Sequence, residues 1–367
     1  CWVGVFYLDT RGRMIVGGIG TGAALLFFPA FLRQRPSSQP GLAFGAGLVF
    51  AVMAAILLRQ QNFGSGYFPG QAHIVYPVGI VLATLVELIA WVRENPAPEP
   101  TPAQPADSFW LTAGLCLGFS GLFLLLFFSF TSPVVMARWA GLPYLWVVGL
   151  ASSAVGLTVV LAFLGRSPVL RLPAWLLLAW NAVFVLALSA AILPSQVNFP
   201  GAPTGYPLLQ PASSILGTTA LVIALLLHPV VYADASLLLG RLSGPGVSAS
   251  RLAGGMALAA LFQLILIFGH IFTTVYDYIP VIGPLFRDRY WLVCVLPGLA
   301  LLLAVFLAKS PLELRRQPEY RRWPAFSAIA LVLFTLWMAA RPTFFLPAAP
   351  GQGELRAMTY NIQQGYS

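Results

Sequence analysis

The chain has 367 residues, of which 59% are hydrophobic and only 8% are charged, and its formal net charge is +9. Ordinary soluble domains contain about 25% charged residues, so this composition excludes a soluble globular protein. Basic residues are scattered between apolar blocks and form no run, which argues against a nucleic-acid-binding surface. We therefore expect a protein of the lipid bilayer, where hydrocarbon covers the apolar surface.

Ten apolar segments follow one another along the chain, and most have roughly the 20 residues that a helix needs to cross a bilayer. They cover about residues 14–33, 41–58, 73–92, 108–130, 143–164, 172–194, 213–231, 254–277, 291–308 and 325–341. Linkers rich in Pro or Gly separate some of them, such as Pro96–Pro102 and Ser243–Gly246. The expected fold is an all-α polytopic membrane protein, with a multi-pass domain at 1–341 and a linker at 342–354.

The first residues, Trp2–Leu8, are typical of a helix already under way, so we expect the natural protein to begin before Cys1. The three cysteines, Cys1, Cys116 and Cys294, are far apart in the sequence. Their spacing supports neither a disulfide framework nor a metal site.

Two parts of the chain repeat each other. Ala54–Phe63 and Ala190–Phe199 are identical at seven of ten positions, and both end in Gln-x-Asn-Phe. Phe130-Thr131-Ser132 is likewise echoed by Phe272-Thr273-Thr274. We expect two units of four helices, at about 40–164 and 172–308, with flanking helices. Because four is an even number, both units would have the same orientation in the membrane.

The basic residues orient this topology. Twelve of the twenty fall on one side of the predicted spans and eight on the other. The loop between the last two predicted helices alone supplies five of the twelve. Because Lys and Arg favour the cytoplasmic side, we expect that side to face the cytoplasm, from a plasma membrane or an endomembrane. The chain after the last helix would then be extracytoplasmic or lumenal.

Polar residues on the predicted outer face form a candidate substrate site. Asn62 and Asn198 hold matching places in the two Gln-x-Asn-Phe loops, where their amides suit a lipid headgroup. The alternative is an Asn that hydrogen-bonds its own turn. His270, Asp277 and Arg287 belong to the densest polar cluster on that face, and the Arg fork suits a phosphate. The alternative there is a set of interfacial side chains that anchor helix ends.

Few polar candidates lie inside the predicted spans. Glu87 is the one acid expected deep within a helix, although nearby Arg93 favours a solvated place at the cytoplasmic interface. His228 is expected to be an ordinary residue near a helix end, and so is His73, for which the alternative is a place in the site on the outer face. The sequence contains no zinc-ligand spacing, Gly-rich phosphate loop or nucleophile elbow, and we expect no metal ligand set within it.

The last thirteen residues, Leu355–Ser367, differ from everything before them. Apolar and polar residues alternate, and Thr359 and Tyr360 favour extended backbone, which predicts a β-strand. A strand needs a partner for its backbone groups. We therefore expect residues 355–367 to be the first strand of a soluble α/β domain that continues beyond Ser367.

The segment Met358–Tyr366, which reads Met-Thr-Tyr-Asn-Ile-Gln-Gln-Gly-Tyr, resembles the opening strand of the endonuclease/exonuclease/phosphatase superfamily. This resemblance implies a DNase I-like fold and a metal-dependent phosphoester site. Asn361 would help to orient the phosphate or the metal ligands, and Mg²⁺ would be the cofactor of the full-length protein. The superfamily's later catalytic residues would lie beyond Ser367, so residues 1–367 alone would not be catalytically complete. Such a domain after a multi-pass region also resembles the family of membrane proteins that remodel the lipid of glycosylphosphatidylinositol (GPI) anchors.

Three functional hypotheses follow from these patterns. The first is the membrane module of a metal-dependent phosphoester hydrolase or lipid-remodelling protein, acting on a phospholipid or glycolipid headgroup at the outer or lumenal face. The second is a transporter or lipid scramblase, against which stands the scarcity of charge at the span centres. The third is a passive membrane anchor. In each case membrane lipids are the expected partners, and nucleic acid is not.

Overall fold

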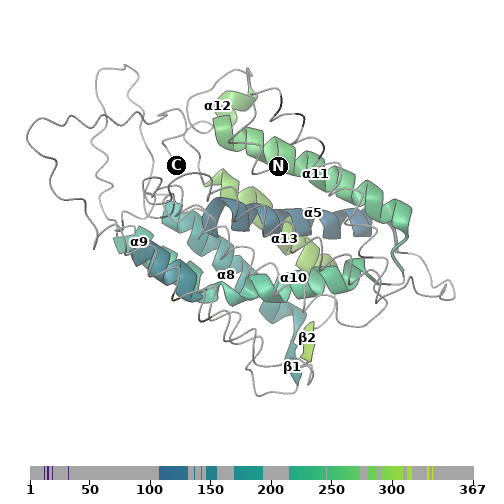
Figure 1. The fold of residues 1–367 in the computed structure, drawn as a ribbon, viewed down its shortest axis with the longest axis horizontal. Coiled ribbons are helices and arrows are strands. Elements are labelled where there is room, and N and C mark those ends of the chain that lie inside the picture. Colours follow the sequence, from purple (N-terminus) through teal and green to yellow (C-terminus); the bar gives the residue numbers. More distant parts are fainter. Residues whose placement is uncertain are drawn as a thin grey trace, which may run out of the picture.

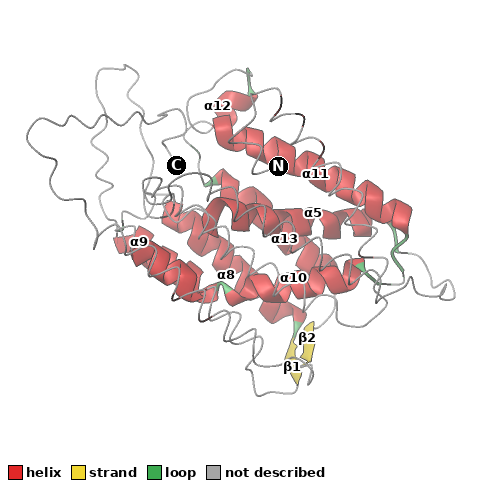
Figure 2. Cartoon of the chain, in the orientation of Figure 1, coloured by secondary structure: helices red, strands yellow, loops and turns green. Residues whose placement is uncertain are grey.

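The computed structural model describes mainly residues 107–130, 146–154, 169–192, 215–244, 246–272, 280–286, 291–308 and 312–315, with a few isolated positions elsewhere. This part of the chain consists of helices and one small antiparallel sheet (Figures 1 and 2). The helices are α5 (Phe109–Leu125), η1 (Leu126–Phe130, a π-helix), α8 (Ala174–Ile192), α9 (Ile215–Leu227), α10 (Pro229–Leu242), α11 (Ala249–Phe272), α12 (Ile282–Phe286) and α13 (Leu292–Ala308). The strands are β1 (Val169–Leu172) and β2 (Leu312–Arg315).

Helix α5 packs between α13 and α11 through small residues. Gly118 of α5 lies against Ala304 of α13, and Gly121 lies against Pro297, so these two helices run antiparallel. On its other neighbour, the Ser120 hydroxyl donates a hydrogen bond to the carbonyl of Ala259 in α11 at 3.1 Å. Glycine has no side chain, so the backbones can approach closely, which is the usual way for helices to pack in a membrane.

Several helix ends meet at one end of the bundle, which we call the sheet end because β1 and β2 lie there. The strand pairing of Val169–Leu172 with Leu312–Arg315 joins the start of α8 to the end of α13. The Asp107 N–H donates to the Gly246 carbonyl at 2.9 Å, which joins the start of α5 to the chain between α10 and α11. These are helix ends that the predicted topology assigns to the more basic side. The placement of that side in the cytoplasm remains a prediction.

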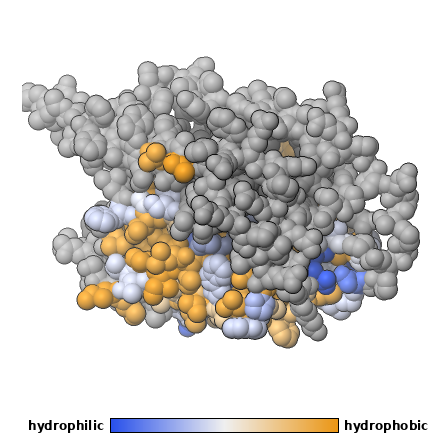
Figure 3. Space-filling view, turned by 90° about the horizontal axis from the view of Figure 1, so that it is seen from below, coloured by the Kyte–Doolittle hydropathy of each residue, from blue (hydrophilic) through white to orange (hydrophobic). Residues whose placement is uncertain are grey.

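Two described helices are long and apolar enough to cross a membrane, namely Ala174–Ile192 and Ala249–His270. Helices α9 and α10 together make a third if they count as one span, bent by 46°. On the face that Figure 3 shows, apolar side chains cover much of the described surface. Large exposed residues on α11 include Leu261, Leu264, Ile265 and Phe268. An apolar exterior is unfavourable in water, so these helices indicate a membrane-associated protein.

The structure corrects the span predicted at 213–231. Helix formation continues to Leu242, with a break at His228. Pro229 has no N–H and cannot continue a helix without a break, but it suits the first position of a new one. Asp234 and Ser236 lie beyond the predicted end of this span, yet both are buried within α10.

Other expectations about the fold are met only in part. Residues 1–341 were expected to form an all-α multi-pass domain, yet β1 and β2 form a short antiparallel sheet between its helices. The predicted span at 254–277 begins earlier, at Ala249, and its described part ends at Phe272. The full set of ten spans, the two repeat units and the strand at 355–367 extend beyond the described residues and stay predictions.

Candidate functional site

Among the residues predicted to form the substrate site, His270 is the one that the structure describes. It lies in the last turn of α11 and is half-buried, beside the place where Phe286 of α12 packs on Gly269. The others lie outside the described residues, namely Asn62, Asn198, Asp277, Arg287 and Asn361. Glu87 and His73 also lie outside them. Their grouping on one face therefore stays a prediction.

A different pair of polar residues lies in the core of the described bundle. Asn181 of α8 and Asp234 of α10 are both 0% exposed. The Asn181 amide nitrogen donates to Asp234 Oδ1 at 2.8 Å and to the Leu177 carbonyl at 3.1 Å. The remaining oxygens, Asp234 Oδ2 and Asn181 Oδ1, make no hydrogen bond with any described group. This pair is the candidate functional site.

The surroundings of the pair are apolar. One turn before and one turn after Asp234 on the same helix stand Val230 and Leu238, both 0% exposed. Leu177 lies one turn before Asn181 and is also fully buried. Burying a polar group costs free energy unless it is hydrogen-bonded, and burying a charge costs much more unless it is paired. Burial of the Asp234 carboxyl group in its ionised form would therefore cost a large amount of free energy.

Helix α8 contacts both halves of the broken span. The Trp180 indole N–H donates to the carbonyl of Leu227, the last residue of α9, at 3.1 Å. The next residue, Asn181, binds Asp234 of α10. At the break itself the His228 N–H donates to the Leu225 carbonyl at 3.2 Å, which takes the place of the bond that Pro229 lacks. The polar pair thus lies within two turns of a break that α8 bridges.

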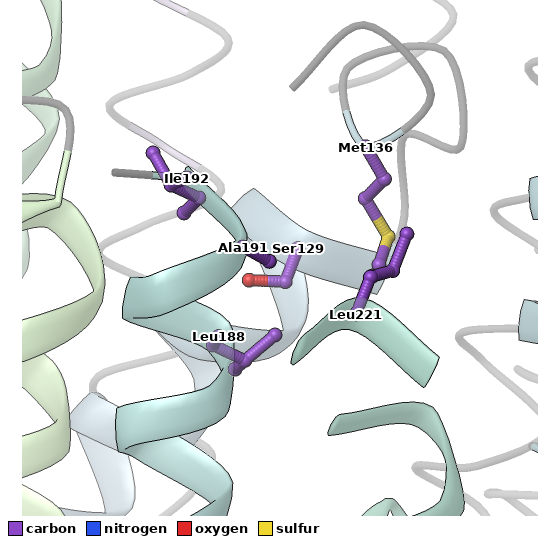
Figure 4. A pocket seen from close by; sticks show the side chains of 6 residues that line it. All are labelled: Ser129, Met136, Leu188, Ala191, Ile192 and Leu221. Carbon is purple, nitrogen blue, oxygen red and sulfur yellow. The ribbon is translucent and has the colours of Figure 1, made fainter. Parts of the chain in front are cut away.

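A second feature is a small cavity beside η1, shown in Figure 4. Its lining consists of Ser129, Met136, Leu188, Ala191, Ile192 and Leu221. Ser129 supplies the oxygen in this lining and also contacts the sulfur of Cys294, with 3.9 Å between Oγ and Sγ. None of the six lining residues is ionisable. The lining is therefore apolar apart from Ser129 and offers no acid, base or metal ligand set.

Within the described ranges, no group of three or more His, Cys, Asp or Glu residues is placed to hold a metal ion. The Mg²⁺ that the resemblance at Asn361 implies stays a prediction, because Asn361 lies outside these ranges. Asp234 with Asn181 provides one carboxylate and one amide oxygen. That set is too small and too weakly charged to suggest a divalent ion.

No family model, curated protein or solved structure matches this chain. Its function must therefore be argued from its own residues.

Sequence reasoning missed the polar pair, although both residues left a signal. Asn181 is a lone amide in the middle of a predicted span. Asp234 was missed because the span was ended at 231, before the apolar run Leu237–Leu239 that continues the helix. A polar residue within an apolar span is by default a functional candidate with a partner to be found. Applied to Asn181, that rule would have led to a search for its partner.

Proposed function

We propose that residues 1–341 are the membrane module of a metal-dependent phosphoester hydrolase or lipid-remodelling protein. Its substrate would be the headgroup of a phospholipid or glycolipid, in the manner of the GPI-anchor lipid-remodelling family. The observation that carries this proposal is the order of two features, an apolar helical bundle and then Thr359–Gly365, which resembles the first strand of a DNase I-like domain. The bundle would hold the lipid, and the following domain would cleave it.

Each predicted residue has a role in this proposal. Asn62, Asn198, His270, Asp277 and Arg287 would bind the headgroup at the extracytoplasmic or lumenal face. Arg287 suits a phosphate because its guanidinium offers a planar pair of donors. Asn361 would orient the phosphate or the metal ligands. Mg²⁺, when bound, would polarise the phosphoryl oxygen.

The test is hydrolysis by the full-length protein in liposomes that contain a headgroup-labelled phospholipid. We expect release of the phosphorylated headgroup that depends on Mg²⁺ and stops with a chelator. Asn361→Ala is expected to lower the rate by about 100-fold or more, as loss of a positioned polar group at a reacting centre does. Gln364→Ala, which changes an amide of the same segment to which the proposal gives no role, is the matched control and should retain activity. Equal rates for both variants and the natural protein would contradict the role of Asn361.

A second candidate function is transport or lipid scrambling. Carriers place their sites near the membrane midplane at interrupted helices, where ionisable residues are common. Asp234, buried close to the break between α9 and α10, is a feature of this kind. The presence of Asp234 inside a helix weakens the objection to a transporter, which was that the centres of the predicted spans have almost no charged residues. It also argues against a passive anchor, because an anchor gains nothing from a buried carboxyl group that costs free energy.

A further inference from the structure

The hydrogen-bond inventory of the Asn181–Asp234 pair is unbalanced. The Asn181 amide has two N–H donors, and both are used, one by the Leu177 carbonyl and one by Asp234 Oδ1. Asn181 Oδ1 and Asp234 Oδ2 remain, and both are buried acceptors without a donor in the described structure. The pair therefore has an excess of acceptor oxygens and, with the carboxylate ionised, one negative charge.

No cationic side chain balances that charge in the described part of the chain. The helices packed against α10 are mainly α5, α8 and α13, whose ionisable side chains are the buried thiols of Cys116 and Cys294. Helix α10 and its cap carry His228, Tyr232 and Arg241. No hydrogen bond or ion pair in the described structure joins any of these to Asp234, whose one partner is Asn181. A fully buried and unpaired carboxylate is too costly to be the resting state of such a bundle.

We propose that Asn181 and Asp234 form a binding site for a single positive charge, a proton or a monovalent metal cation, beside the break between α9 and α10. A proton on Asp234 Oδ2 turns that oxygen into a hydrogen-bond donor. The amide oxygen of Asn181, Oδ1, is then available as its acceptor. Acid and amide then satisfy each other with two hydrogen bonds. A monovalent cation would take the same two oxygens as two of its ligands. Neither case requires the hydrolase activity proposed above.

The site lies where a conformational change would reach it. The break at His228 lies within two turns of Asp234, and α8 contacts both sides of the break through Trp180 and Asn181. Helix α8 packs more on α9 than on α10, so movement of α10 relative to α9 would separate Asp234 from its one donor, Asn181 of α8. Release of the bound proton or cation would therefore favour bending between α9 and α10, and bending would favour its release. This gives the transport candidate a named site and a named ligand class.

The experiment uses the full-length protein in lipid nanodiscs and infrared spectroscopy at neutral pH. If the occupant is a proton, the spectrum contains a protonated carboxyl band that shifts when aspartate is labelled with ¹³C. That band is absent from Asp234→Asn and retained in Asp107→Asn, the control carboxylate outside the helices. The isotope shift is measured on the natural sequence, so it identifies a protonated aspartate even where a variant does not fold.

A second arm identifies a metal cation. If the occupant is Na⁺ or K⁺, the carboxyl band is absent. The melting temperature is then higher in NaCl or KCl than in choline chloride at the same ionic strength. This rise is lost in Asp234→Asn and kept in Asp107→Asn. A protein that shows neither the ¹³C-sensitive band nor cation-dependent stabilisation overturns the proposal. Neither experiment measures headgroup hydrolysis. Their results therefore test the cation site even if the protein proves not to be a hydrolase.

Discussion

Replacing Asn181 with Leu is expected to lower the free energy of unfolding by about 1–3 kcal/mol, because Asp234 then loses its one donor while still buried. Asp234→Leu alone leaves the Asn181 amide incompletely bonded and is expected to cost less, because no buried carboxyl remains. The double variant, with Leu at both positions, should be less destabilised than the sum of the two single variants. Leu fills the space without a polar group, so the penalty of an unpaired partner disappears.

The measurement is a double-mutant cycle, with reversible unfolding followed in mixed micelles. Hydrogen bonds between membrane helices contribute about 0.6 kcal/mol on average. Because Asn181 donates to a buried carboxyl group, we expect a coupling energy between Asn181 and Asp234 well above that value. Ser189→Ala is the control on the same helix, because the bond that the Ser189 hydroxyl makes in the described structure is to the Val185 carbonyl one turn earlier. Additive effects of Asn181→Leu and Asp234→Leu would contradict an energetic link between them.

Adding one methyl group at Gly118 or Gly121 is expected to destabilise the bundle by about 1–3 kcal/mol per position. A Cβ at Gly118 would overlap the Cβ of Ala304, and a Cβ at Gly121 would overlap the backbone carbonyl of Pro297. Neither obstacle is the flexible end of a side chain, so α5 and α13 would have to move apart. The contacts on both sides of the interface would then be lost together.

Gly240→Ala is the matched control for these two variants. Gly240 also lies inside a helix, but a Cβ there would meet nothing within 4 Å. Since Ala favours helix over Gly by about 1 kcal/mol, this variant should be neutral or slightly stabilised. Thermal unfolding of the three variants under one condition gives the comparison. Equal melting temperatures for Gly118→Ala and Gly240→Ala would show that the close contact of α5 with α13 is not important for stability.

Composition and apolar run length were enough to predict membrane-type helices at α8 and α11, because a span needs little more than length and hydrophobicity. They failed at α10, because the span predicted at 213–231 stops short of Asp234, whereas the helix continues to Leu242. Hydropathy averages over a window, so it cannot distinguish a carboxyl group in solvent from one that is bonded to a neighbouring helix. The partner of Asp234 is 53 residues earlier in the chain, and no local pattern joins them.

The β1–β2 sheet and the helix break at His228 also depend on contacts that local sequence patterns do not reveal. The pairing of β1 with β2 joins Val169–Leu172 to Leu312–Arg315, which only tertiary packing brings together. The interruption at His228 could have been foreseen from Pro229, but whether the chain then turns back or continues as helix depends on the contacts of α8. The sites predicted at Asn62, Asn198, Asp277, Arg287 and Asn361 rest on the sequence alone. They are tested by the hydrolysis experiment rather than by the fold.

The most direct test of the account is whether the described helices cross a bilayer. Ser250 and Val281 are exposed and lie near opposite ends of α11, a helix of 24 residues and therefore about 36 Å long. Each is replaced by Cys, one at a time, in a background without the native cysteines, and sealed vesicles are treated with a thiol reagent that cannot cross membranes. The reagent is expected to label the Val281→Cys protein from the outside, and the Ser250→Cys protein only after permeabilisation. Labelling of both from the same side of intact vesicles would contradict it.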